Sequence, residues 1–539
     1  MIQDEEMPVL PTKWKAIFAK LALVNRTFFH ASTDVLWEVM DTVQPFFQRL
    51  LDPDMDEDGM LIGGALSYFE DFLPTHWERF ELYSSKMKTL ILHRKNTLTV
   101  RNGWLYLLSI IKGRPQLLFP SVKRLYLTSN DDFSLFIAFQ ALPEINFLSI
   151  DFDKESIEDD AESCVALTRA LRTNAPELTA LRILNPVTSH LIDRLSKLSP
   201  LTFVHLRIND DIQMADECER LNSLRSLEKL VIEQTFDERD VEIANAFPVS
   251  CDIARPISRK SKLAHLKDIV VKANGTTQFE VAAGISPHHL TDLELDVLPD
   301  ILRTQMVLAP LFITIHAKRN PQMTSLKVRC PPLVAGIDPS ELGDLRGNTL
   351  YTSTTPFIAA LASLAALTTL SITEIPFFAV DVIIKMFRVL QKLPLLETFR
   401  FLPSAVTILD SDVLALPPLA LLEENSRQNP RLVELAIPMD PSAVPDVPRD
   451  YLSTHNLRSL WLNIPTQGVV ALSQGDQAVE LALYLDGLFP QLKSLSDYPE
   501  ATQGDRNAWR PIERIVSSYQ KLRARIIEGA RLSAAIQVD

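Results

Sequence analysis

A run of alternating aspartates resembles the start of a metal-binding loop. Asp54, Asp56, Asp58 and Gly59 spell D-x-D-x-D-G, the opening of an EF-hand calcium loop. Carboxylates at alternate positions converge on one hard cation, and the glycine permits a sharp turn. The closing position of that loop requires a bidentate Glu, and Ala65 stands there instead. We therefore predict a solvated acidic loop without a bound metal.

A second polar group lies near the middle of the chain. His288 and His289 precede Asp292, Glu294 and Asp296, which would share one face of a strand. Imidazole and carboxylate side chains can together hold a metal ion. Their spacing matches no established ligand motif, so we expect a charged, solvated strand face.

Motifs for common catalytic chemistry are missing from the sequence. It contains no GxxxxGK[ST], GxGxxG, GxSxG or HExxH pattern, so phosphate-cradling, acyl-transfer and zinc-hydrolase sites lack their signatures. We expect a protein that is not an enzyme and uses no cofactor. The four cysteines form no CxxC pair, which argues against a zinc ribbon or a disulfide framework. A reducing compartment, cytoplasmic or nuclear, fits this usage.

Net charge and hydropathy argue against two classes of partner. The chain carries 54 basic and 68 acidic residues, a balance of 54 − 68 = −14. Such a chain binds nucleic acid or anionic lipid poorly over its whole surface. The segment from Gly347 to Thr373 has no charge, but its many hydroxyl groups and Pro356 argue against a membrane span. A helix over 359–366 and a strand over 367–372 are predicted instead, and the acidic N-terminus predicts no secretory signal.

The chief pattern is a repeated phrase. Leucine supplies 81 of the 539 residues. It recurs in a phrase consisting of an apolar residue, two variable residues, Leu, one variable residue and an aliphatic residue. The copies are MKTLIL (87–92), VKRLYL (122–127), INFLSI (145–150), LTALRI (178–183), FVHLRI (203–208), LEKLVI (227–232), LKDIVV (266–271), LTDLEL (290–295), MTSLKV (323–328), LTTLSI (367–372), LETFRF (396–401), LVELAI (432–437), LRSLWL (457–462) and the weaker LKSLS (492–496).

This phrase predicts a short strand with one buried face, because its last positions alternate between apolar and polar residues. The distance between successive fourth positions ranges from 148 − 125 = 23 to 370 − 326 = 44 residues. Helical patterns fill the longer intervals, as in 165–174, 380–393 and 479–488. We predict an α/β leucine-rich repeat solenoid of short parallel strands with outer helices. The alternative is an ordinary α/β domain with leucine-rich strands.

The phrase also predicts which side chains face a partner. Its fourth and sixth positions point into the core, so the third and fifth point outward along the sheet. The larger outward residues are Arg124, Tyr126, Arg182, His205, Arg207, Lys327, Arg400 and Trp461, interrupted by Asp292, Glu294 and Asp296. Since Trp, Tyr and Arg are enriched at binding hot spots, we predict target contacts at Tyr126, Arg182, Arg207, Lys327, Arg400 and Trp461. The alternative is that the arginines only keep this face soluble.

The C-terminal segment 506–532 has no strand phrase and predicts an amphipathic helix. Its apolar residues recur at intervals of three and four, and arginines occupy the other faces. Such a helix would cap the last repeat or, alternatively, bind a partner.

The N-terminal segment 10–41 resembles an F-box. The matching residues are Leu10–Pro11, Ile17–Phe18, Leu23–Val24–Asn25–Arg26 with Phe28, and Asp34–Val35–Leu36–Trp37. With the block 73–92 and the repeats behind it, the chain resembles the F-box-like leucine-rich repeat proteins of mushroom-forming (basidiomycete) fungi. Only seven positions separate Ile17 from Val24, fewer than in an F-box, so the module is short, with a helix missing or degenerated. The alternative is a plain helical cap for the solenoid.

The resemblance implies a function. Such proteins are substrate-recognition subunits of SCF-type ubiquitin ligases, so the expected partners are the adaptor subunit with its cullin complex and an unknown target protein. The residues expected to bind the adaptor are Leu23, Val24, Phe28, Leu36 and Trp37. The alternative function is a non-catalytic interaction scaffold whose F-box has decayed.

These predictions divide the chain into four parts. They are an F-box-like module over 1–50, a linker with the acidic loop over 51–80, the solenoid over 81–505 and a C-terminal capping helix over 506–539.

Overall fold

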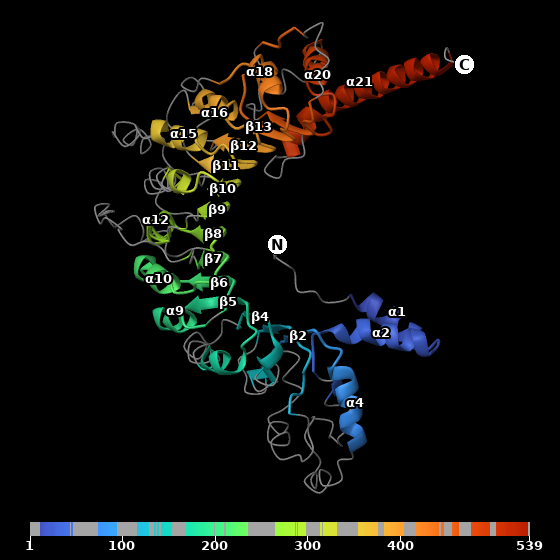
Figure 1. Ribbon diagram of the computed structural model, residues 1–539. Helices are drawn as coiled ribbons and strands as arrows, with labels where there is room; N and C mark the ends of the chain where they lie inside the picture. The colour runs from blue at the N-terminus through green and yellow to red at the C-terminus, as the bar shows by residue number, and fades with distance from the viewer. Residues whose placement is uncertain are drawn as a thin grey trace. The chain divides into compact units, whose positions relative to one another are not determined.

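The computed structural model describes most of the predicted repeats (Figure 1). It describes residues 11–43, 45–46, 74–93, 116–128, 134–135, 137–138, 142–152, 166, 168–198, 200–209, 212–235, 263, 265–285, 287, 289–297, 313–314, 316–330, 354–375, 382–403, 416–440, 443–446, 455–462, 476–495 and 503–536. The chain divides into two compact units. The first comprises Met1–Thr235 and Ser261–Leu266, and the second Phe236–Lys260 and Lys267–Asp539.

Each unit is built on parallel strands whose order in the sheet follows their order in the chain. The strands of the first unit are β1 (Val39–Met40), β2 (Thr89–Leu92), β3 (Arg124–Leu127), β4 (Phe147–Ile150), β5 (Ala180–Val187), β6 (Phe203–Ile208) and β7 (Lys229–Gln234). Those of the second are β8 (Asp268–Ala273), β9 (Asp292–Val297), β10 (Ser325–Arg329), β11 (Thr369–Ile375), β12 (Thr398–Pro403), β13 (Glu434–Ile437) and β14 (Ser459–Leu462). The repeated α/β, solenoid-like architecture is therefore confirmed.

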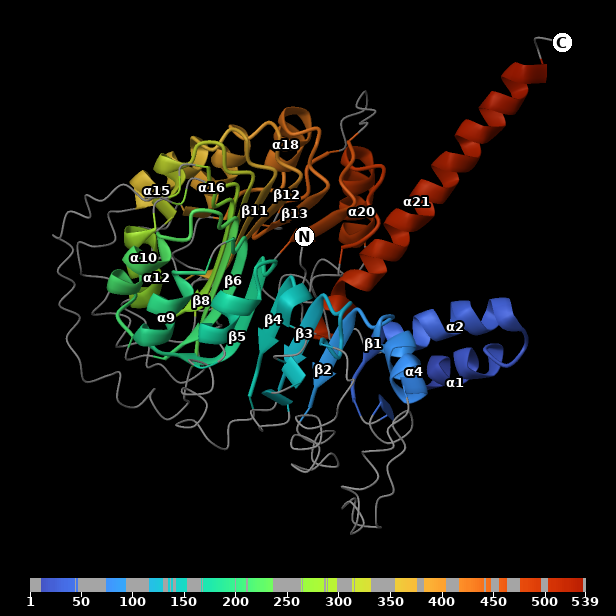
Figure 2. The same cartoon turned by 60° about the horizontal axis from the view of Figure 1, so that its bottom comes forward.

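In the described part of the chain, helices lie between many of the successive strands, as the sequence predicts. The first unit contains α1 (Thr12–Leu21), α2 (Arg26–Glu38), α4 (Pro74–Ser84), the 3₁₀ helix η2 (Leu142–Glu144), α9 (Ser189–Leu195) and α10 (Met214–Leu221). The second contains α12 (Gly275–Gly284), α15 (Thr354–Ala362), α16 (Val382–Leu390), α18 (Leu421–Gln428), α20 (Asp476–Leu488) and α21 (Gln503–Ile536). In Figures 1 and 2, α9 and α10 lie on one side of β5 and β6, and α15 and α16 lie on one side of β11 and β12.

The strand register confirms the repeated phrase in nearly every copy. Leu293 pairs with Ile269 and Leu326, which occupy the same fourth position of neighbouring copies. The copy predicted over 203–208 is wrong by two residues. Val204, not Leu206, pairs with Leu181, so this copy is LTFVHL over 201–206. The alternation of apolar and polar residues cannot distinguish the two registers, because a shift of two residues keeps every side chain on the same face of the strand.

Burial separates the two faces clearly in β9, whereas all four residues of β2 are buried. In β9 the burial alternates along the strand, with Leu293, Leu295 and Val297 buried and the intervening residues partly exposed. The first position of the phrase is also buried, as Leu290 and Leu396 illustrate. The fourth and sixth positions therefore form the core beneath the helices.

A ladder of threonines links neighbouring repeats at the second position of the phrase. Each hydroxyl donates to the backbone carbonyl of the second residue in the preceding copy, at 3.0–3.2 Å. The donors are Thr179, Thr202, Thr291, Thr324 and Thr368. These bonds reinforce the parallel stacking where the chain enters each strand.

The N-terminal module joins the first sheet through a strand that the sequence analysis missed. Val39 and Met40, directly after α2, pair in parallel with Thr89 and Leu90. Two residues are too few to show a period, so no sequence signal marks this strand. Asn25 caps α2 by accepting a hydrogen bond from the Phe28 backbone at 3.0 Å.

Two further sequence predictions concern membranes and calcium. Within the part of the chain that the structure describes, no helix is long and apolar enough to cross a bilayer. The uncharged segment instead yields α15 and β11, close to the predicted helix and strand. The acidic loop at Asp54, Asp56 and Asp58 lies outside the described residues.

Candidate interaction surfaces

The helix-free face of the first unit carries a mixed row of aromatic and charged side chains. Tyr126, Ser149, Arg182 and His205 pair in register across β3 to β6 and so lie side by side. Tyr126 is only 6% exposed, and its ring centroid lies 5.3 Å from that of Phe147. Most of this predicted contact residue is therefore covered within the fold.

The charges on this face are only partly compensated. Glu233 on β7 lies 3.3 Å from His205 (Oε2 to Nε2) and 3.7 Å from Arg207 (Oε2 to Nη2). Arg182, on β5, has a buried Nε atom without a hydrogen-bond partner among the described residues. The sequence analysis named the arginines but missed Glu233, whose place beside them is set by strand register.

The corresponding face of the second unit is better balanced. Lys327 lies 3.8 Å from Glu294 (Nζ to Oε2) on the neighbouring strand. Arg400 on β12 donates through Nε to Glu434 on β13. Each predicted contact cation of this unit thus faces a carboxylate, and Glu434 is a second partner that the sequence analysis missed.

Trp461 lies at the end of the same face but is largely buried. It is 7% exposed and packs in an apolar cluster with Leu402 and Ala436. The side chain is therefore used mainly for packing within the sheet, which stabilises the fold, and it offers little surface to a partner.

The N-terminal helical hairpin, α1 with α2, exposes apolar side chains. Leu23 is 86% exposed, Val24 62% and Phe28 46%, with Trp14 and Val35 also exposed. None of the residues of α1 is buried. Exposed apolar side chains gathered on one small element are typical of an interaction site.

The other two predicted adaptor-binding residues have intramolecular roles. Trp37 is half-buried and stacks on Tyr83 of α4, with ring centroids 4.7 Å apart. Its ring also packs against Phe46 in a T-shaped arrangement, with ring centroids 4.9 Å apart. Leu36 is also half-buried. The structure therefore brings Leu23, Val24 and Phe28 to the open surface but uses Trp37 to hold the hairpin on the first repeat.

The C-terminal helix α21 begins as a cap for the last repeats. Trp509, Ile512 and Val516 are buried, whereas Leu522 and Ile526 of the predicted apolar stripe are exposed. Arg523 donates to the carboxylate of Asp486 on α20 and, at 3.2 Å, to its backbone carbonyl. Past this ion pair the described side chains of the helix are exposed, including Ile526 and Ile527.

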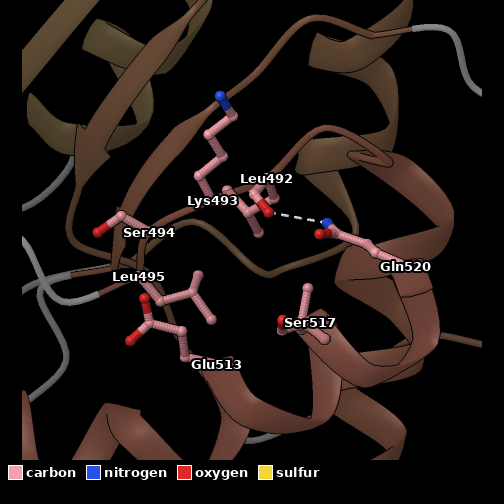
Figure 3. Close-up of a pocket in the computed structure, with 8 residues that line it drawn as sticks. Leu492, Lys493, Ser494, Leu495, Glu513, Ser517 and Gln520 are labelled. Atoms are coloured by element: carbon pink, nitrogen blue, oxygen red, sulfur yellow. Dashed lines mark hydrogen bonds between the residues drawn. The ribbon is translucent and has the colours of Figure 1, made fainter.

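A crevice of about 200 Å³ lies between α21 and the last copy of the phrase (Figure 3). Gln520 bridges its walls by donating to the Leu492 carbonyl at 2.8 Å. The lining residues are Leu492, Lys493, Ser494, Leu495, Glu513, Val516, Ser517 and Gln520. The crevice is smaller than ordinary ligand pockets, and no histidine or cysteine lines it, so its geometry fits packing rather than chemistry.

Two of the three carboxylates of β9 lie beside cations, whereas Asp292 lies between Asp268 and Ser325. Asp296 lies in register between Lys272 and Arg329, and Glu294 faces Lys327. No cluster of three or more potential metal ligands occurs among the residues that the structure describes. His288 lies outside them, and His289 is exposed.

Comparison with known proteins assigns no family to this chain. No protein-family model matches the chain, and no curated protein is detectably similar to it.

Proposed function

We propose that this chain is an F-box-like leucine-rich repeat protein that acts as the substrate-recognition subunit of an SCF-type ubiquitin ligase in the cytoplasm or nucleus. The N-terminal hairpin binds the adaptor subunit and thereby the cullin complex. The helix-free faces of the repeat sheets bind the target protein. Ubiquitin transfer is carried out by other subunits.

The observation that carries this proposal is the exposed apolar surface of Leu23, Val24 and Phe28. These are the residues of the F-box phrases, and the described part of the chain leaves them open to solvent. The parallel repeat sheet that follows them in the chain offers extended faces to a protein target. The step from this architecture to ubiquitin ligation is an analogy with the family that the sequence resembles.

Adaptor capture tests the proposal directly. Burying a large apolar side chain contributes about 1.5–3 kcal/mol. The double change Val24→Asp with Phe28→Asp is therefore expected to weaken adaptor binding about 100-fold or more. The measurement is co-purification with the adaptor subunit, followed by titration calorimetry.

A matched variant controls for added charge. Thr27→Asp with His30→Asp places the same two carboxylates on exposed positions of α2 and is expected to leave capture intact. Circular dichroism must show that both double variants stay folded. Failure of the unmodified chain to capture adaptor would contradict the receptor role.

The second candidate is an interaction scaffold whose F-box has decayed. Its support is the structural use of Trp37, which packs on Tyr83 and Phe46 instead of facing a partner. Target binding without adaptor capture is the result that this function predicts.

A further inference from the structure

Arg182 on β5 lacks a counter-ion in the described part of the chain. Its Nε atom is buried and has no hydrogen-bond partner there. An arginine side chain is always protonated in proteins. Burying part of a cation without an anion or acceptor costs free energy. The charge of Arg182 is therefore uncompensated by any described residue, and an anion bound to it would supply the missing partner.

Comparable cations on the sheet faces are compensated. Arg207 faces Glu233 at 3.7 Å, Lys327 faces Glu294 at 3.8 Å, and Arg400 donates to Glu434. Among the four predicted contact cations, Arg182 is the one for which the described residues supply no carboxylate. Arg182 thus differs from the other three predicted contact cations.

The neighbours of Arg182 suit an anionic group. Ser149 on β4 and His205 on β6 flank it in register, and Figure 2 shows these strands side by side. Adjacent parallel strands lie about 4.8 Å apart, close enough for side chains of both to contact one small anion. Both flanking residues are buried, at 5% and 6% exposure, so the partly exposed Arg182 is the member of this group that a partner can reach.

The charge balance of the cluster favours the same ligand. Glu233 pairs with Arg207 and with His205, so among the described residues no carboxylate compensates the charge of Arg182. Asp151, two residues after Ser149, is exposed and makes no ion pair with Arg182. Within the described residues, a positive centre thus remains at Arg182 in a chain whose net charge is −14.

We propose that Arg182, flanked in register by Ser149 and His205, binds an oxyanion group of the target protein, either a carboxylate or a phosphate monoester. A guanidinium presents paired N–H donors in a planar fork that matches the oxygens of both groups. The inference deepens the proposed target-binding role of this face but is independent of adaptor capture.

The test uses the full chain and three small probes. N-acetyl glutamate amide and N-acetyl phosphoserine amide represent the two anion sources, and N-acetyl serine amide is the neutral control. Saturation-transfer difference NMR measures each dissociation constant. At least one anionic probe is expected to bind, with a constant on the order of 1 mM, and the neutral probe is not.

Arg182→Gln is expected to raise the dissociation constant of the bound probe about tenfold or more, because it removes the charge and the fork. Arg182→Lys keeps the charge without the fork and should bind with intermediate strength. Arg172→Gln, at an exposed position of the helical stretch 168–174, removes an equal charge and should bind as the unmodified chain does.

Stability provides an independent readout. Since Arg182 has no partner to lose, the Gln variant is expected to melt at or above the temperature of the unmodified chain. The inference is overturned if no anionic probe binds, if the Gln variant binds as well as the unmodified chain, or if it melts lower. Any of these results together with normal adaptor capture would leave the receptor function standing.

Discussion

Replacing the buried His316 with Leu is expected to make the second unit less sensitive to acid. The imidazole is 1% exposed. Burial, with a smaller contribution from the nearby charge of Arg319, lowers the pKa of His316 from 6.5 to about 3. The folded protein therefore holds this side chain neutral at every pH above about 3.

The sign and size of the effect follow from proton linkage. Between pH 6.5 and about 3 the unfolded chain binds a proton at His316 that the folded chain does not. The stabilisation is complete above pH 6.5 and declines as the pH falls to about 3. At pH 5.0 the loss is 1.5 pH units at about 1.36 kcal/mol each, or about 2 kcal/mol. The folded population falls about 30-fold relative to the unfolded one.

Chemical denaturation at pH 7.5 and pH 5.0 measures this loss. The free energy of unfolding should fall by about 2 kcal/mol more in the unmodified chain than in the Leu variant. Comparing the change with pH, rather than the stability at one pH, removes the effect of altered packing. His289→Leu alters an exposed histidine and should follow the unmodified chain. Parallel pH dependence of the His316 variant and the unmodified chain would refute the reasoning.

Two other predictions concern packing and calcium. Trp461→Ala should lower the free energy of unfolding by about 3 kcal/mol, because it removes the large side chain that packs with Leu402 and Ala436. Ser459→Ala on the same strand is the control and should change this free energy by less than about 1 kcal/mol. Denaturant titrations measure both values. Millimolar calcium should leave the melting temperature unchanged, since the acidic loop lacks its closing Glu; a rise that Asp56→Ala abolishes would reveal a real site.

The sequence predicted the candidate functional surfaces only in part. The phrase placed Arg182, Arg207, Lys327 and Arg400 on strand faces correctly, because alternation is a local property of the chain. It did not show that Arg182 alone among them lacks a carboxylate in the described residues. The partners of the others come from strands 26 to 34 residues away in sequence, as in 233 − 207 = 26 and 434 − 400 = 34. Nor did residue type show that Tyr126 and Trp461 are mostly covered.

The sequence by itself determined the repeating strands and which residues of each form the core. An apolar residue at the first, fourth and sixth positions must leave water, and a strand places the last two on one face. Tertiary structure alone decided the register of β6, the pairing of β1 with β2 and the use of Trp37 as a packing residue. These three features depend on which segments, distant in sequence, lie side by side in the fold. Contacts of that kind produce no periodic pattern of residues along the chain.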